Sequence, residues 1–123
     1  MTAPAVDLKA ALARLGGDVD LYRQLYPMFR EDAQAMLGRL GDLLAGGQRL
    51  EAQAVLHTLK GLAATMGAMG LAAAAEQAEQ AMSREASQDD LGLLANAHDA
   101  FVQTCCTLEQ ALPALVAAKG ETS

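Results

Sequence analysis

Apolar residues recur at steps of three and four along five successive stretches of the chain, which predicts helices throughout. At about 100° per residue, such steps place side chains on one face of a helix. The stretches are residues 7–15, 18–45, 50–66, 71–82 and 89–115. Glycines separate the first four of them, at positions 16–17, 46–47, and 67 and 70. Alanine and leucine dominate and isoleucine is absent, which favours helix over sheet.

The connections between these stretches are short, so consecutive helices should run antiparallel. The pattern therefore predicts an all-α fold, an antiparallel up-and-down four-helix bundle with a short extra N-terminal helix. We expect a single domain over residues 1–123 with an ordered core of about residues 7–118. Pro27 and Pro113 lie inside predicted helices and are expected to bend or distort them.

Composition excludes several classes of function. The formal net charge is −6, which argues against nucleic acid or an anionic membrane surface as partner, because both require clustered cations. No apolar run approaches the roughly 20 residues of a membrane span, and the first residues lack the pattern of a secretion signal. The cytoplasm is therefore the expected compartment. Cys105 and Cys106 are adjacent, which suits neither an intrachain disulfide nor a metal site.

His57 lies on the third predicted helix, on the side opposite the apolar residues. The apolar stripe of that helix consists of Val55, Leu59, Leu62 and Met66, widened by Ala52, Leu56 and Ala63. His57 is roughly 160° from the middle of this stripe, so it should face water. Its expected surroundings on the helix surface are Gln53, Lys60, Gly61 and Ala64. An exposed imidazole in such a setting indicates that another macromolecule has to reach the ring.

The neighbours of His57 fit phosphoryl chemistry. Neutral imidazole is a good nucleophile near physiological pH, and a phosphoryl group on it carries roughly two negative charges. Lys60, one turn along, can offer an ammonium to those oxygens. Gly61 stands directly above the ring, where a side chain would crowd it. A mid-helix glycine costs about 1 kcal/mol against alanine, so its presence there favours a role in access to the ring.

A carboxylate partner for His57 follows from hairpin geometry. If the third and fourth helices fold back about residue 68, His57 lies beside Glu79, with Gln80 close by. A carboxylate that accepts the Nδ1 hydrogen would fix the tautomer and leave Nε2 free as the nucleophile. Gln53, Ala64 and Gln80 are the candidate partner-binding residues around this site.

At these residues the sequence resembles a known family, the histidine-containing phosphotransfer (HPt) domains of bacterial phosphorelays. The resemblance rests on His57-Thr58-Leu59-Lys60-Gly61 with the later Gly67 and Leu71, and on a lead-in of Leu15-Gly16-Gly17-Asp18, Leu21-Tyr22, Phe29 and Asp32. Glu79 falls where the related domain of chemotaxis kinases has a glutamate that hydrogen-bonds the histidine; other members carry glutamine there. Leu62, where a small residue is common, and Pro27 depart from the usual pattern.

The resemblance implies a relay intermediate in an antiparallel four-helix bundle. His57 would accept a phosphoryl group from a receiver-domain phosphoaspartate and pass it to another receiver aspartate. The implied partners are receiver domains of response regulators or hybrid histidine kinases. Mg²⁺ is expected on the receiver, and this chain is expected to need no cofactor of its own. It has no glycine-rich nucleotide loop or kinase motif, so we expect no ATP-dependent kinase activity.

Two other functions compete with phosphotransfer. A non-catalytic helical adaptor could bind a signalling partner through the same face. A metal site inside the bundle would need inward carboxylates and Glu-x-x-His pairs, which the sequence lacks, so no metal is expected. The other histidine, His98, falls on the apolar seam of the last helix and is interpreted as a partly buried core residue. A monomer is the simplest expectation, because each long helix has one apolar face to bury.

Overall fold

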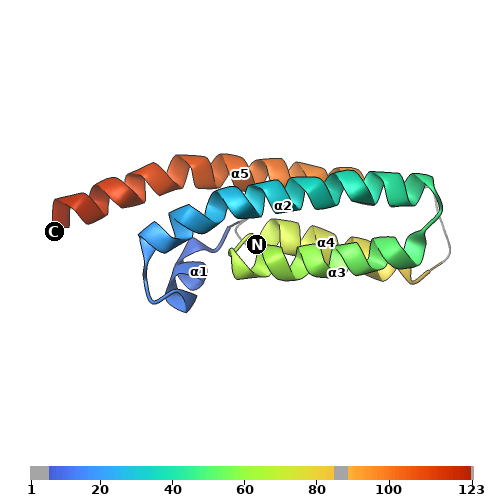
Figure 1. Cartoon of the computed structure of the whole chain (residues 1–123), viewed down its shortest axis with the longest axis horizontal. Helices are drawn as coiled ribbons and strands as arrows, with labels where there is room; N and C mark the ends of the chain where they lie inside the picture. The colour runs from blue at the N-terminus through green and yellow to red at the C-terminus, as the bar shows by residue number, and fades with distance from the viewer. Residues whose placement is uncertain (1–5, 85–88, 123) are drawn as a thin grey trace.

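The chain folds into five α-helices in a computed structural model that describes residues 6–84 and 89–122, with side chains up to residue 115 (Figure 1). They are α1 (Leu8–Arg14), α2 (Val19–Ala45), α3 (Arg49–Thr65), α4 (Met69–Met82) and α5 (Asp89–Thr122). Within those residues there is no strand, which confirms the all-α prediction. None of these helices is both long and apolar enough to cross a membrane.

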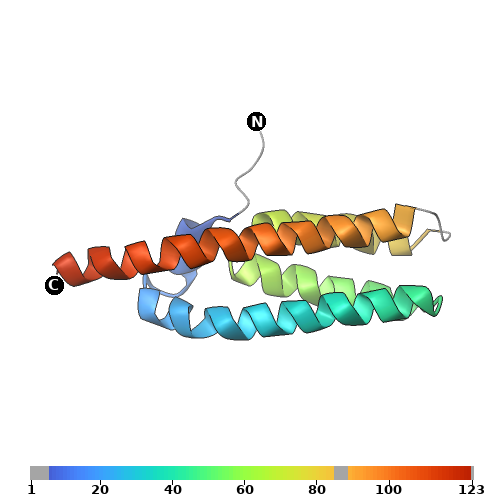
Figure 2. The same ribbon diagram turned by 90° about the horizontal axis from the view of Figure 1, so that it is seen from above.

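The four longer helices lie side by side along one axis, and α1 sits at the end where α3 turns into α4 (Figures 1 and 2). α2 packs against α3 and α5, and α4 packs against the same two helices. Each long helix therefore has two neighbours, which suits a helix with one broad apolar face.

Local signals set the helix boundaries. Asp7 and Asp18 cap α1 and α2, since their side chains accept the backbone N–H of Ala10 at 3.1 Å and of Leu21 at 3.0 Å. The prolines do not end their helices, because α2 runs through Pro27 and α5 runs through Pro113. Each proline lacks the N–H that would donate a helix hydrogen bond, but its helix continues on both sides.

The buried face of α3 is rotated slightly from the predicted stripe. Its buried residues are Ala52, Leu56, Leu59 and Ala63. Val55 and Leu62 are only partly buried and pack against the rim of the core. The centre of the buried face therefore lies on the Ala52–Leu56–Leu59–Ala63 side of α3, with Val55 and Leu62 at its edge.

The prediction for His98 is wrong, because its side chain is exposed. The buried face of α5 instead consists of Ala97, Phe101, Thr104, Cys105, Leu108 and Leu112. Leu91, which continues the same predicted seam, is 70% exposed. The small Ala97 faces the core in place of His98, so the seam is displaced by one residue at this end of α5.

The turn between α3 and α4 is held by contacts from both N-terminal helices. The buried Tyr22 hydroxyl donates to the Met66 carbonyl at 2.6 Å, and burial raises the pKa of Tyr22 to about 12. The Asp7 N–H donates to the Gly67 carbonyl at 2.6 Å. Gly67 has φ +75°, and a Cβ there would lie 2.4 Å from the Asp7 carbonyl oxygen. Only glycine accommodates both this backbone conformation and this close approach.

The opposite end of the bundle is joined through Arg49. Its guanidinium forms an ion pair with Asp90 of α5 and donates to the carbonyl oxygens of Ala81 and Arg84 at the end of α4, at 2.7 and 3.0 Å. An arginine placed there also satisfies carbonyls that the end of a helix leaves without partners. With both ends held, the register between α3 and α4 is fixed in the middle, where His57 lies.

Candidate functional site

His57 projects from the middle of α3 into solvent, and its side chain is 71% exposed. Its Nδ1 atom lies 2.9 Å from Oε2 and 3.3 Å from Oε1 of Glu79 on α4. The prediction that His57 and Glu79 lie side by side across the α3–α4 hairpin is therefore confirmed. Because an ionised carboxylate only accepts hydrogen bonds, Nδ1 carries the hydrogen and donates it to Glu79.

Glu79 is held by two donors at once. Lys60, one turn beyond His57 on α3, donates from Nζ to Oε1 at 3.2 Å. The Glu79 side chain is only 14% exposed. Its burial raises the pKa of the carboxyl, but the hydrogen bonds and positive charges of His57 and Lys60 outweigh that effect and lower the pKa below its ordinary 4.5. Glu79 is therefore ionised at neutral pH and fixes the imidazole.

This contact leaves the other ring nitrogen available. With the hydrogen on Nδ1, Nε2 keeps its lone pair, and it forms no hydrogen bond with any of the described residues. In its neutral form, an exposed imidazole held in this way through Nδ1 is equipped for nucleophilic attack by Nε2.

Gly61 leaves the space above the ring open. It is exposed, and a Cβ added to it would meet no atom within 4 Å. Close packing of α3 therefore does not require glycine at this position. The absence of a side chain instead leaves the surface open on the C-terminal side of His57. A role of Gly61 in access to the ring stays a prediction.

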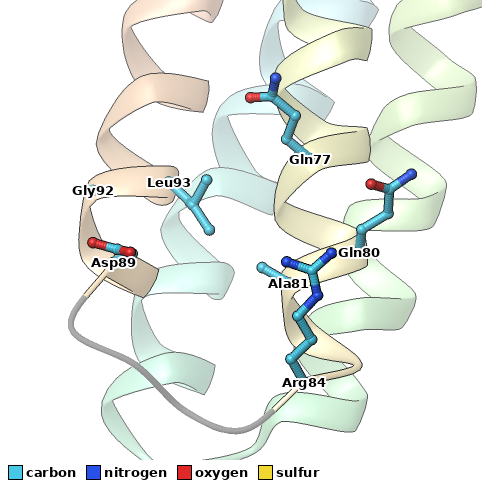
Figure 3. Close-up of a pocket in the computed structure, with 7 residues that line it drawn as sticks. All are labelled: Gln77, Gln80, Ala81, Arg84, Asp89, Gly92 and Leu93. Atoms are coloured by element: carbon cyan, nitrogen blue, oxygen red, sulfur yellow. The ribbon is translucent and has the colours of Figure 1, made fainter.

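The predicted partner-binding residues are Gln53, Ala64 and Gln80, and among the described residues none of them hydrogen-bonds to His57. Gln53 and Ala64 are partly buried on α3, and Gln80 is exposed on α4. Gln80 also lines a surface hollow of about 580 Å³ between α4 and α5. Arg84 and Leu93 lie on either side of this hollow (Figure 3). The hollow faces α5, whereas Glu79 faces α3, so the two features occupy different sides of α4.

The described residues form no cluster that resembles a metal centre. Among residues 6–84 and 89–122, no three His, Cys, Asp or Glu side chains come together in a way that could hold a metal ion. The chemistry available to the site is thus that of one imidazole, oriented by one carboxylate, with an ammonium one turn away.

Comparison with known families agrees with the site. The Hpt domain family matches residues 24–118, which is well over half of the chain. The chain belongs to the Hpt domain family. His57, Lys60, Gly61 and Glu79 all lie inside the matched segment of this Hpt domain, whereas α1 lies outside it. The comparisons with curated proteins and with solved structures found no match.

Two apolar residues of α3 and α4 in this Hpt domain are exposed, and sequence reasoning missed the first of them. Leu50 is 81% exposed and Met69 is 40% exposed. Leu50 lies seven residues before His57, so the two side chains point within about 20° of each other on α3. The signal was present in the sequence, since the same angular argument that placed His57 in solvent also places Leu50 there.

Sequence reasoning also missed Arg14. Its Nη1 atom donates to the carbonyl oxygen of Ala64 at 2.7 Å, although 50 residues separate them in the chain. No periodicity could have predicted this contact, because it depends on how the short α1 packs against the end of α3.

Proposed function

We propose that this chain is a phosphorelay intermediate in which Nε2 of His57 receives a phosphoryl group from a receiver-domain phosphoaspartate. A second receiver aspartate then takes the group away. The observation that carries the proposal is the 2.9 Å contact between Nδ1 of an exposed His57 and Oε2 of Glu79. Membership in the Hpt domain family supports it independently of that geometry.

In the first step, the lone pair of Nε2 attacks phosphorus in line with the departing aspartate oxygen. The N–P bond forms as the O–P bond of the acyl phosphate breaks, and the receiver aspartate leaves as a carboxylate. The Nδ1 hydrogen stays on the ring, and the resulting imidazolium character is balanced by the Glu79 carboxylate. The reverse sequence, with a new aspartate oxygen attacking phosphorus, discharges His57.

The roles of the neighbouring residues follow from their positions. Glu79 holds the ring and its tautomer, and Lys60 supplies positive charge beside the incoming phosphoryl oxygens. Gly61 leaves room for the partner. Gln53, Ala64 and Gln80 are proposed to contact the receiver around the ring. We further propose an antiparallel up-and-down arrangement of α2 to α5, which the four pairs of helix contacts support.

The partner is proposed to bring the metal ion for the reaction. Receiver domains of response regulators or hybrid kinases would carry the Mg²⁺ that neutralises the developing charge. The Hpt chain would provide a positioned nucleophile and a docking surface, with no cofactor of its own and no phosphorylation from ATP. A bacterial cytoplasm is the proposed setting, and a monomer the proposed state.

Incubation with a phosphorylated receiver domain tests the proposal. We expect label to move to the chain as an acid-labile, base-stable phosphoramidate, and to be absent from His57→Gln. Stable binding of the receiver without any labelled chain would instead identify a non-catalytic adaptor. Persistent labelling of His57→Gln would show that the phosphoacceptor is another residue.

A further inference from the structure

We propose that Arg14, on the helix that lies outside the family-matched segment, is a docking residue for acidic groups of the receiver domain. This inference rests on the proposed function and extends its docking surface onto α1. The Hpt match begins at residue 24, so α1 lies outside the matched segment.

Arg14 stands at the end of a strip that begins at His57. Its guanidinium bonds the carbonyl of Ala64, seven residues after His57 on α3. Seven residues bring a helix back to within about 20° of the same direction and advance it by about 10 Å. Arg14 therefore lies on the same side of the bundle as the ring, roughly two turns away.

The strip between them is open enough for a partner to cover it. Gly61 has no side chain and nothing near its open side, and Ala64 adds only a methyl group. A standard protein interface buries about 800 Å² on each partner, which corresponds to a disc of roughly 16 Å radius. An interface of this size centred on His57 would therefore include Arg14.

The charge of Arg14 matches this partner. The chain has a net charge of −6, and Lys60, the cation beside the ring, is already engaged with Glu79. Arg14 is exposed, and among the described residues it forms no ion pair. A guanidinium recognises carboxylates well, and those meant here are acidic side chains on the receiver surface around its active site, about 10 Å from the reacting aspartate. Complementary charges at the edge of an interface speed the association of two proteins and favour the correct partner.

The guanidinium is also held in place before any partner arrives. α1 is anchored by the Asp7–Gly67 backbone hydrogen bond and by Ala11, which is 1% exposed. The bond to Ala64 uses one donor atom of Arg14 and leaves the other N–H groups of the fork for a carboxylate. Fixing a charged group on an anchored helix reduces the entropy lost when the partner binds.

Three variants separate charge from structure. Arg14→Gln removes the charge and leaves a shorter amide side chain, and Arg14→Lys keeps the charge. Arg84→Gln removes an exposed cation at the opposite end of the bundle and serves as the matched control. Each is mixed with a panel of receiver domains phosphorylated by acetyl phosphate, and transfer rates are measured against receiver concentration at low and high salt.

We expect Arg14→Gln to raise KM about three- to tenfold at low salt for the receiver that transfers fastest, with kcat unchanged. The effect should shrink at high salt, where such charges are screened. Arg14→Lys should stay within about twofold of the parent, and Arg84→Gln should match the parent.

Other results would overturn the inference. An unchanged KM for Arg14→Gln, or a fall in kcat in its place, would show that Arg14 does not dock the receiver. An equal loss in Arg14→Lys would show that charge is not the cause. If the parent chain accepts phosphate from no receiver, the proposed function fails and this inference fails with it; normal transfer by Arg14→Gln removes the inference alone.

Discussion

Nδ1 of His57 and Oε2 of Glu79 lie 2.9 Å apart on neighbouring helices, 22 residues apart in the chain. The exposed ring is thereby hydrogen-bonded to a carboxylate that is itself largely buried. The pairing gives an otherwise mobile surface side chain a defined orientation, and it determines which ring nitrogen faces the partner.

Glu79→Gln should slow phosphoryl transfer by about 10-fold. A hydrogen bond to a charged group contributes roughly 1.5–3 kcal/mol, and glutamine retains an acceptor while losing the charge that balances the phosphorylated ring. Single-turnover transfer from a phosphorylated receiver measures the loss. Glu31→Gln, at an exposed carboxylate on α2, is the control and should transfer at the parent rate. A parent-like rate for Glu79→Gln would mean that the carboxylate does not assist the ring.

The same carboxylate should make stability depend on acid pH. Its pKa in the folded chain lies below the ordinary 4.5, so its stabilising contribution is fully present above about pH 4.5. That contribution is lost as the pH falls through the lower folded-state pKa, because His57 and Lys60 then lose their charged acceptor. Urea unfolding of the parent and of Glu79→Gln should differ by about 1 kcal/mol at pH 5.5. The difference should shrink steadily towards pH 2.5; a constant or growing difference would contradict this.

Substitutions at Gly61 should separate the stability of the helix from access to His57. Glycine to alanine in a helix with free space contributes roughly 0.5–1 kcal/mol, so Gly61→Ala should raise the melting temperature. Gly61→Arg should remain folded and slow transfer, because its side chain blocks the approach to Nε2. A Cβ added at Gly38 on α2 would likewise meet no atom within 4 Å, so Gly38→Arg is the matched control. Equal transfer rates for the two arginine variants would show that Gly61 is not needed for access.

Gly67 should be less replaceable than Gly47. Both have a positive φ, +75° and +73°, so alanine is strained at either position. Only at Gly67 would the new Cβ also meet the Asp7 carbonyl, at 2.4 Å, whereas at Gly47 it meets nothing within 4 Å. We expect Gly67→Ala to lose at least about 1 kcal/mol more than Gly47→Ala in urea unfolding. Equal losses would indicate that the N-terminal segment moves aside freely.

The His57–Glu79 pair could be predicted because the intervening structure is regular. Two uninterrupted helices joined by a short turn have few possible registers, so equal distances from the turn place residues side by side. The exposure of His57 followed in the same way from the apolar stripe on α3. Such predictions succeed where the information is local and periodic.

Contacts that depend on how the helices pack could not be predicted from the sequence. His98 continues the period of the leucine seam, which predicts a core position, but the structure places the smaller Ala97 there. Arg14 reaches Ala64, and Arg49 reaches Asp90 and the end of α4, over separations of 32 to 50 residues. These contacts depend on helix ends and on crossing positions, which period and spacing do not encode.

The atom that carries the phosphoryl group is the most direct test of the account. After transfer from a phosphorylated receiver to the ¹⁵N-labelled chain, ³¹P and long-range ¹H–¹⁵N correlation spectra identify the phosphorylated ring nitrogen. Since Glu79 holds Nδ1, the account predicts phosphate on Nε2 of His57 with the Nδ1 hydrogen retained. Phosphate on Nδ1 of His57, or on any other residue, would contradict it.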